Sequence, residues 1–344
     1  MDVHQVSRRG VVLPVHLDAT GRTGPTPGQA RGGRWRGVAP GWYVPGEVDG
    51  AVLDQRIVEA LAGVPSYAAV TGWASLARRD ARWFKGLAAD GRTVVDVPVA
   101  LQTRGVRRRA GVELTEDWLF DDDIEVVDGL PVTRPERAVA FEVCRTRSLA
   151  PAVRMVDLAC AADLTDLATL DTYTQRLIAR PGVPRLRTAL AWADENVWSP
   201  QESTMRVVWR QRIPRALLAN RPLFDHDGRH LVTPDLIDPL AGVVGEYDGA
   251  VHLGDGLRRR DLDRDALYRD LGLELVTMMS AGTGDVHHFE RRLAAAYRRA
   301  ARRPAESPRW TLRQPAWWVD TSTVARRRAL TLDQRATWLR RLAL

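Results

Sequence analysis

Three carboxylates stand close together in one short stretch of the chain. Asp235 lies in the sequence Pro-Asp-Leu-Ile-Asp, and Glu246 and Asp248 lie in Gly-Glu-Tyr-Asp-Gly. A set of oxygen ligands like this suits Mg²⁺ or Mn²⁺ far better than zinc. The chemistry it points to is metal-assisted hydrolysis, in which the cation activates water and offsets developing charge. The alternative is an exposed hairpin with solvated acids, which is what isolated Asp and Glu residues usually are.

The spacing of these acids predicts a β-hairpin that gathers them. Leu240–Gly242 lie midway between Asp235 and Glu246, so an antiparallel pair that turns there sets these two residues opposite each other. Asp248 is two residues beyond Glu246 and therefore shares its face of the strand. The apolar residues that flank the turn favour a half-buried strand pair.

Two further residues are candidates for the same site. Ser199, Pro200 and Glu202 have the N-cap, N1 and N3 spacing of a capping box, which predicts a helix start. Glu202 is therefore either a cap alone or a fourth carboxylate that reaches a metal or an attacking water, and the two roles are compatible. His252 could protonate the leaving oxygen or orient water, although a lone histidine is more often a surface or packing residue.

Composition limits the class of protein. The 344 residues are 45% hydrophobic and 27% charged, which indicates a globular chain too long for a single core. The net charge of +7 is carried almost entirely by arginine, and this balance favours a polyanionic partner such as DNA. No apolar stretch is long enough for a membrane span and the start is polar, so we expect a cytoplasmic protein without a membrane partner. The two cysteines are too few for a disulfide framework, and no organic cofactor is expected.

Arginine clusters along the chain either track phosphates or form solvated faces. They are Arg107–Arg109, Arg258–Arg260, Arg291–Arg292 and Arg326–Arg328. Arg258, Arg259, Arg260 and Arg264 are the candidate DNA-binding set. Arg264 lies one turn from Asp261 in a predicted helix, where it either pairs with that aspartate or contacts the scissile phosphate.

Stretches rich in glycine and proline, which interrupt helices and strands, divide the chain into four segments. The sequence therefore predicts an α+β multidomain protein. Residues 1–50 are rich in Gly, Pro and Arg and leave room for a short helix and a β-turn-β element. Residues 51–195 predict a compact α+β domain, with helices over Leu53–Leu61 and Ala68–Ala77 and a hairpin turning at Asp128-Gly129.

The other two segments differ in kind. Residues 196–304 predict the order helix, three strands, helix, strand, helix, with the first strand near Asn220 to Phe224. Residues 305–344 form a Trp/Arg-rich extension. The indoles of Trp310, Trp317 and Trp318 either stack on exposed bases or pack the tail back onto the preceding domain.

From Ser199 to Arg302, this order and these acids resemble the PD-(D/E)XK nuclease superfamily, in its branch near very-short-patch-repair endonucleases. In that resemblance Glu202 matches the acid of the first helix, Asp235 the motif aspartate and Glu246 the first acid of the second metal-binding motif. Asp248 stands where many members have lysine. The repair-like branch shares this departure, and its further signatures are matched by Gly249, His252, Asp261 and Arg264.

The resemblance implies a restriction-endonuclease-like αβββαβ core that hydrolyses DNA phosphodiester bonds. Mg²⁺ or Mn²⁺ would be held by Asp235, Glu246 and Asp248. Glu202 and His252 would join these three as catalytic residues.

The N-terminal half resembles AbiEi-type antitoxins in three short motifs, which are Gly41–Pro45, Val70–Ala74 and Gly129–Pro135. That resemblance implies a winged-helix-like segment over residues 1–50, here degenerate, an antitoxin-like domain over residues 51–195, and DNA binding with transcriptional autoregulation. Two hypotheses follow. The chain is a Mg²⁺-dependent endodeoxyribonuclease serving defence or repair, which the intact acids favour. Alternatively, it is a catalytically inactive DNA-binding regulator or antitoxin with a partner toxin, which the absent lysine and the antitoxin-like half favour.

Overall fold

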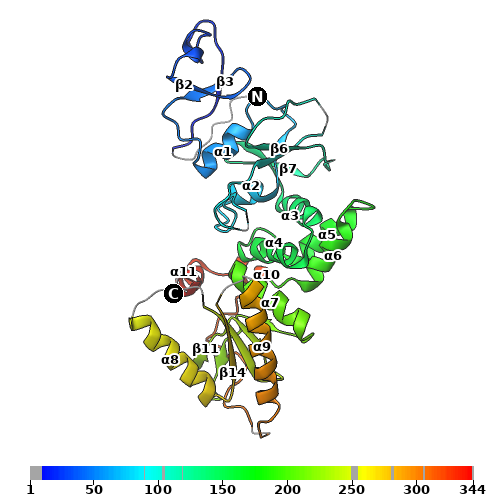
Figure 1. The fold of residues 1–344 in the computed structure, drawn as a ribbon, viewed down its shortest axis with the longest axis vertical. Coiled ribbons are helices and arrows are strands. Elements are labelled where there is room, and N and C mark those ends of the chain that lie inside the picture. Colours follow the sequence, from blue (N-terminus) through cyan, green and yellow to red (C-terminus); the bar gives the residue numbers. More distant parts are fainter. Residues whose placement is uncertain are drawn as a thin grey trace. The chain divides into compact units, whose positions relative to one another are not determined.

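The computed structural model describes residues 10–88, 90–102, 105–117, 119–248, 255–279, 283–304 and 307–342, with the side chains of residues 255–262, 283–284 and 341–342 left out. The chain divides into two compact units, Met1–Arg145 and Thr146–Leu344. Each unit combines helices with a sheet of mixed parallel and antiparallel strands, so the predicted α+β class is confirmed (Figure 1). In these ranges no helix is both long and apolar enough to cross a bilayer.

The first unit contains two sheets. A three-stranded sheet of order β1-β3-β2 is built from β1 (Val15–His16), β2 (Trp35–Ala39) and β3 (Trp42–Pro45), with a 3₁₀ turn at Gln29–Arg31. A five-stranded sheet of order β6-β5-β4-β8-β7 is built from β4 (Ala69–Val70), β5 (Val97–Ala100), β6 (Val112–Thr115), β7 (Ile124–Val127) and β8 (Leu130–Thr133). The helices of this unit are α1 (Leu53–Ala60), α2 (Gly72–Ala77) and α3 (Pro135–Arg145).

Local turn chemistry explains one confirmed prediction and one error in this unit. The β7–β8 hairpin turns at Asp128 and Gly129, both with positive φ, as a two-residue turn that matches strand twist requires. The predicted helix over Ala68–Ala77 is wrong in its first half, where β4 pairs with β5 and β8 in the centre of the sheet. Helix α2 begins only at Gly72, whose φ of 54° breaks the run.

The second unit places a helical layer before a four-stranded sheet of order β14-β13-β12-β9. The helical layer consists of α4 (Leu149–Ala161), α5 (Leu167–Arg176), α6 (Val183–Trp192) and α7 (Pro200–Arg212). The sheet strands are β9 (Leu218–Ala219), β12 (Leu236–Asp238), β13 (Val243–Tyr247) and β14 (Glu274–Met278). The remaining elements are the β10 (Leu223–Phe224) and β11 (His230–Val232) hairpin, α8 (Asp255–Asp270), α9 (Thr283–Ala300), α10 (Val324–Arg328) and α11 (Leu332–Leu342).

Alternate strand residues give this sheet two cores. Leu236 and Val243 pack with residues of α7 and α9, whereas Ile237 and Val244 pack with residues of α8. Helices α8 and α9 accordingly lie on opposite sides of the sheet (Figure 1). The α8 face is the one toward which Glu246 points, because Glu246 contacts residues of that helix.

The strand predicted near Asn220 to Phe224 is divided in the structure. Strand β9 ends at Ala219, and Asn220 has a φ of 48°, which turns the chain out of the sheet. Strand β10 then pairs with β11 in a separate hairpin. The left-handed conformation at Asn220 is the physical reason for the break, since extended strands require negative φ.

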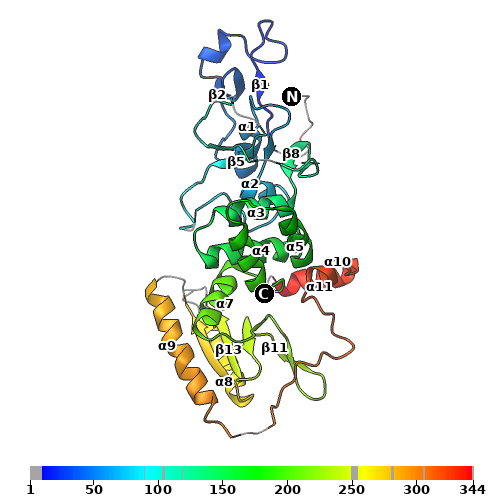
Figure 2. The same ribbon diagram turned by 90° about the vertical axis from the view of Figure 1, so that its right-hand side faces the viewer.

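The tryptophans of the C-terminal extension pack back onto this unit. Trp310 is buried in the α8-side core, and Trp318 lies 5.1 Å from the ring of Phe224 and stacks on His230. Figure 2 shows this segment passing the β11 side of the sheet on its way to α10 and α11. The packing alternative is therefore confirmed for Trp310 and Trp318, while the side chain of Trp317 stays 57% exposed.

Gly245 allows helix α7 to lie close to the sheet. A Cβ atom at this position would lie 2.6 Å from a ring carbon of the fully buried Trp209 on α7. Gly245→Ala should therefore lower the free energy of unfolding by about 1–3 kcal/mol through overpacking, measured by urea denaturation. Gly33→Ala is the matched control, since its Cβ would meet no atom within 4 Å, and an equal loss in both variants would contradict the prediction.

Candidate functional site

The β12–β13 hairpin has the predicted register. Leu236 pairs with Gly245 and Ile237 with Val244, and continuing this antiparallel register by one residue sets Asp235 opposite Glu246. The Asp235 carboxylate also accepts a hydrogen bond from the Tyr247 backbone N–H at 2.7 Å. The prediction that these two acids face each other across the hairpin is thus confirmed.

Glu202 belongs both to a helix start and to the carboxylate cluster. Ser199 is the N-cap of α7 and its hydroxyl accepts from the Glu202 N–H at 3.2 Å. The Glu202 Oε2 atom in turn accepts from the Trp198 N–H at 2.9 Å and from Asn220 Nδ2 at 2.7 Å. Glu202 is therefore fixed at the N-terminus of α7, and its role in the helix cap is confirmed. Its role toward a metal or an attacking water stays a prediction.

Burial, and then the charge of Asp235, define the electrostatics of the cluster. Burial and then the charge of Asp235 raise the pKa of Glu202 to about 7 and that of Glu246 to about 8. The pKa of Asp235 is also raised by burial, although its surface is partly exposed, because protein surrounds it on most sides. Glu202, Asp235 and Glu246 thus form a carboxylate cluster. Ionisation of each carboxyl group in it is costly without a cation.

Helix α8 supplies both polar contacts of Glu246. The Tyr268 hydroxyl bonds to Oε1, and Arg264 Nη1 donates to Oε2 at 3.2 Å. Arg264 is four residues before Tyr268, so both side chains lie on the same face of α8. The Arg264 side chain is 49% exposed, so it lies at the solvent-facing edge of the carboxylate cluster.

The other predicted site residues are less directly placed. Asp248 follows the end of β13, half-buried, and its backbone N–H donates to Met278 O at 2.9 Å. Its charge, after burial, raises the pKa of Tyr247. His252 lies outside the described residues, and so do the side chains of Asp261, Arg258, Arg259 and Arg260. The predictions for those five residues stay predictions.

Asn220 and Tyr268 are site residues that the sequence did not indicate to us. The amide of Asn220 donates to Glu202 and to Asn196 O, while its backbone N–H donates to Asp235 O at 2.9 Å. Asn220 therefore links the helix that carries Glu202 to the segment that carries Asp235. The available signals were an asparagine between two short apolar runs, typical of a left-handed turn, and a tyrosine one helical turn after Arg264.

One arginine in each of two arginine clusters has a structural role. Arg109 donates to Glu59 O, Ala60 O and Ala62 O at the C-terminal end of α1. Arg327 is buried and donates to Asp163 and to Cys160 O, both at 2.7 Å. In both cases arginine satisfies carbonyl groups at the end of a helix, so these two residues are not available for phosphates.

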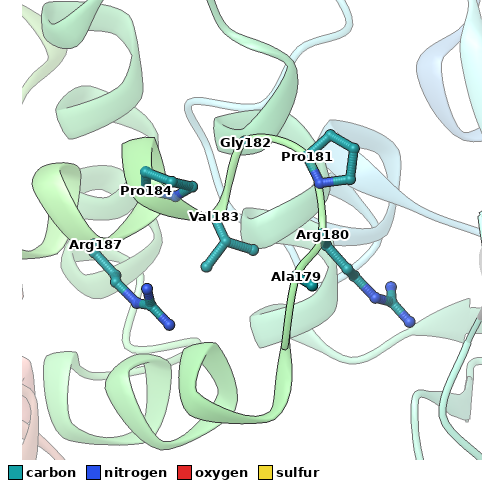
Figure 3. A pocket seen from close by; sticks show the side chains of 7 residues that line it. All are labelled: Ala179, Arg180, Pro181, Gly182, Val183, Pro184 and Arg187. Atoms are coloured by element: carbon teal, nitrogen blue, oxygen red, sulfur yellow. The ribbon is translucent and has the colours of Figure 1, made fainter.

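A surface hollow of about 390 Å³ lies away from these acids, in the α5–α6 connection (Figure 3). No carboxylate lines it, and Arg180 and Arg187 stand on either side of its Pro181–Pro184 turn. It therefore contributes nothing to the carboxylate cluster.

The donor chemistry of the cluster fits a hard divalent cation. Carboxylate oxygens are the ligands that Mg²⁺ and Mn²⁺ prefer, and a cation would offset the burial and the repulsion from Asp235 that raise the pKa values of Glu202 and Glu246. Among the described residues, no three His, Cys, Asp or Glu side chains are already spaced as a complete ligand set.

Comparison of the chain with known protein families, with curated proteins and with solved structures gave no match.

The metal-free protein should lose stability as the pH rises from about 5 to about 8. The folded chain holds the protons of Glu202 and Glu246 up to about 7 and about 8, whereas the ordinary pKa is 4.5. The unfolded state then binds fewer protons in that window, so raising the pH favours unfolding by up to about 1.4 kcal/mol per pH unit for each group. The stabilisation from the two protonated glutamates is complete below their ordinary pKa. It is lost as the pH passes the pKa that each has in the folded chain.

Urea denaturation in EDTA across this pH range measures the effect. Glu246→Gln removes one titrating group and should show a shallower decline than the wild type. Parallel curves for the two proteins would contradict the assignment of the slope to this residue.

Proposed function

We propose that the chain is a metal-dependent endodeoxyribonuclease with a PD-(D/E)XK-like catalytic core in its second unit. The observation that carries the proposal is the carboxylate cluster, in which burial raises the pKa of Glu202, Asp235 and Glu246, and the charge of Asp235 raises the pKa of the two glutamates further. The partly exposed Arg264 pairs with Glu246. Buried groups with perturbed pKa values and specific charge partners are characteristic of functional sites. The α7, β12, β13 and α8 arrangement around them supports the core that the sequence resemblance implies.

Each residue then has a definable task. Asp235 and Glu246 would hold Mg²⁺ or Mn²⁺, with Asp248 as a further oxygen donor. When bound, such a cation supplies Lewis acidity for phosphodiester hydrolysis. Glu202 would accept a hydrogen bond from the attacking water and orient it. Arg264, whose side chain is 49% exposed beside Glu246, would bind the phosphate as a charged donor.

The partner in this proposal is DNA. Arg258, Arg259 and Arg260 precede Arg264 on α8 and would extend the positive charge along the phosphate backbone. The first unit would serve as an AbiEi-antitoxin-like module that targets the DNA, in a process of defence or repair.

The test is cleavage of supercoiled, linear, mismatched and single-stranded DNA by the purified protein with Mg²⁺, Mn²⁺ or EDTA. Metal-dependent cleavage of at least one substrate, absent in EDTA, is the expected result. Purification of the Asp235→Asn variant by the same route controls for a contaminating nuclease.

One observation favours the alternative, a catalytically inactive DNA-binding regulator or antitoxin. Arg264 already provides Glu246 with a cation, so the site can be partly neutralised without a metal. DNA retained in a mobility-shift assay, with no substrate cleaved under any metal condition, would overturn the nuclease proposal and support this second function. Co-purification of a toxin with the full chain would add to that support.

A further inference from the structure

Tyr268 is the most completely enclosed polar contact of the carboxylate cluster. Its side chain is fully buried among the apolar residues of the α8-side core, including Ile237, Val244 and Leu271. Its hydroxyl bonds to Glu246 Oε1. The ring is therefore held by packing, and the hydroxyl marks a fixed point for one oxygen of Glu246.

The hydroxyl acts as the donor in this contact. A carboxylate oxygen is the acceptor in such a pair, so the Tyr268 O–H donates to Glu246 Oε1. Arg264 holds the other oxygen, Oε2, from a partly exposed position. A long exposed side chain can move to a phosphate, whereas the buried tyrosine cannot, so the orientation of Glu246 depends chiefly on Tyr268.

We propose that Tyr268 is a positioning residue, which orients the Glu246 carboxylate for a divalent cation and does not itself contact the reacting atoms. This inference rests on the proposed function. Tyr268 lies outside the set of metal ligands and would raise the metal affinity by fixing one of them, as hydrogen bonds to metal-binding carboxylates generally do.

The same unit contains a second tyrosine that bonds to a buried carboxylate, and its substitution is a matched control for Tyr268→Phe. Tyr297 on α9 donates its hydroxyl to Asp238 Oδ2 at 2.7 Å. Asp238 is a buried strand carboxylate that also accepts from the Leu240 and Ala241 N–H groups, both at 3.1 Å. Tyr297→Phe therefore removes the same kind of contact from a carboxylate that lies on the other side of the sheet, toward α9. It also removes the hydrogen bond that the Tyr297 oxygen accepts from Trp209 Nε1 at 3.0 Å.

The experiment is calorimetric titration of Mn²⁺ into the full-length wild type, Tyr268→Phe and Tyr297→Phe, with thermal unfolding to confirm that each protein is folded. Phenylalanine keeps the packed ring and removes only the hydroxyl. Tyr268→Phe should weaken Mn²⁺ binding by about 10–100-fold, while Tyr297→Phe should stay within about 3-fold of the wild type.

Each other outcome has a defined meaning. Wild-type affinity in Tyr268→Phe, or equal losses in both variants, would overturn the positioning role and leave the proposed function standing. No Mn²⁺ binding by the wild type would overturn the proposed function, and the positioning role with it.

Discussion

Under the proposed function, replacing Asp235 with asparagine should lower metal-dependent DNA cleavage by about 10³-fold, because it removes one of the anions that would hold the cation. Metal-ion stabilisation of the transition state is worth several kcal/mol, which converts to a loss of this size. Asparagine retains an oxygen that can accept the Tyr247 N–H, so the hairpin should keep its geometry. The measurement is single-turnover cleavage at saturating protein with Mg²⁺ and with Mn²⁺.

Asp238→Asn is the matched control for this variant. Asp238 lies three residues further along the same hairpin and is buried, but its partners include turn amides, Tyr297 and, at 3.9 Å, Arg215. Cleavage by Asp238→Asn should stay within about 3-fold of the wild type, because no catalytic charge is lost. Activity retained by Asp235→Asn, or an equal loss in both variants, would refute the role assigned to Asp235.

Removing Asp157 should lower the free energy of unfolding of the second unit by about 3–5 kcal/mol. Asp157 on α4 is fully buried. Its two carboxylate oxygens, Oδ1 and Oδ2, accept hydrogen bonds from Arg206 Nη2 on α7 at 3.0 and 2.8 Å. Ser203 and the Asp194 N–H donate to the same carboxylate at 2.6 and 2.8 Å. Asp157→Ala leaves the Arg206 charge buried without its partner, which is the main source of the cost.

Chemical denaturation followed by circular dichroism measures this loss. Asp171→Ala is the control, because Asp171 is an exposed aspartate on α5 that accepts a local hydrogen bond from Gln175, and its loss should cost less than about 0.5 kcal/mol. The double variant Asp157→Leu, Arg206→Met should recover part of the stability, since it removes both charges. A loss in Asp157→Ala no larger than in Asp171→Ala would show that the buried pair does not anchor α7 to α4.

The sequence by itself determined the elements in which short-range physics decides the outcome. The Asp235–Glu246 pairing follows from a short turn and the two-residue period of a strand, so counting residues was sufficient. Ser199 begins α7 as its spacing to Glu202 requires. The β7–β8 hairpin follows from an Asp-Gly turn. In each case the interacting residues are near neighbours in the chain.

Errors arose where a distant partner overrode a local pattern. The run at Ala69 and Val70 has helical spacing, but pairing in the centre of a sheet makes it a strand. Arg109 and Arg327 belong to clusters that resemble phosphate-binding patches, yet each is used to satisfy helix-end carbonyls. Charge density along the sequence does not reveal which carbonyl groups packing brings within reach.

Only the tertiary structure decided what surrounds the carboxylates. Asn220 reaches Glu202 because α7 packs against the sheet, and Tyr268 reaches Glu246 because α8 covers the opposite face. The identity of these partners depends on the packing of whole helices across the strands, which involves residues 18 and 22 positions apart. Local sequence therefore placed the acids on their elements. The packing of those elements brought Glu202, Asp235 and Glu246 close enough for the charge of Asp235 to raise the pKa of both glutamates.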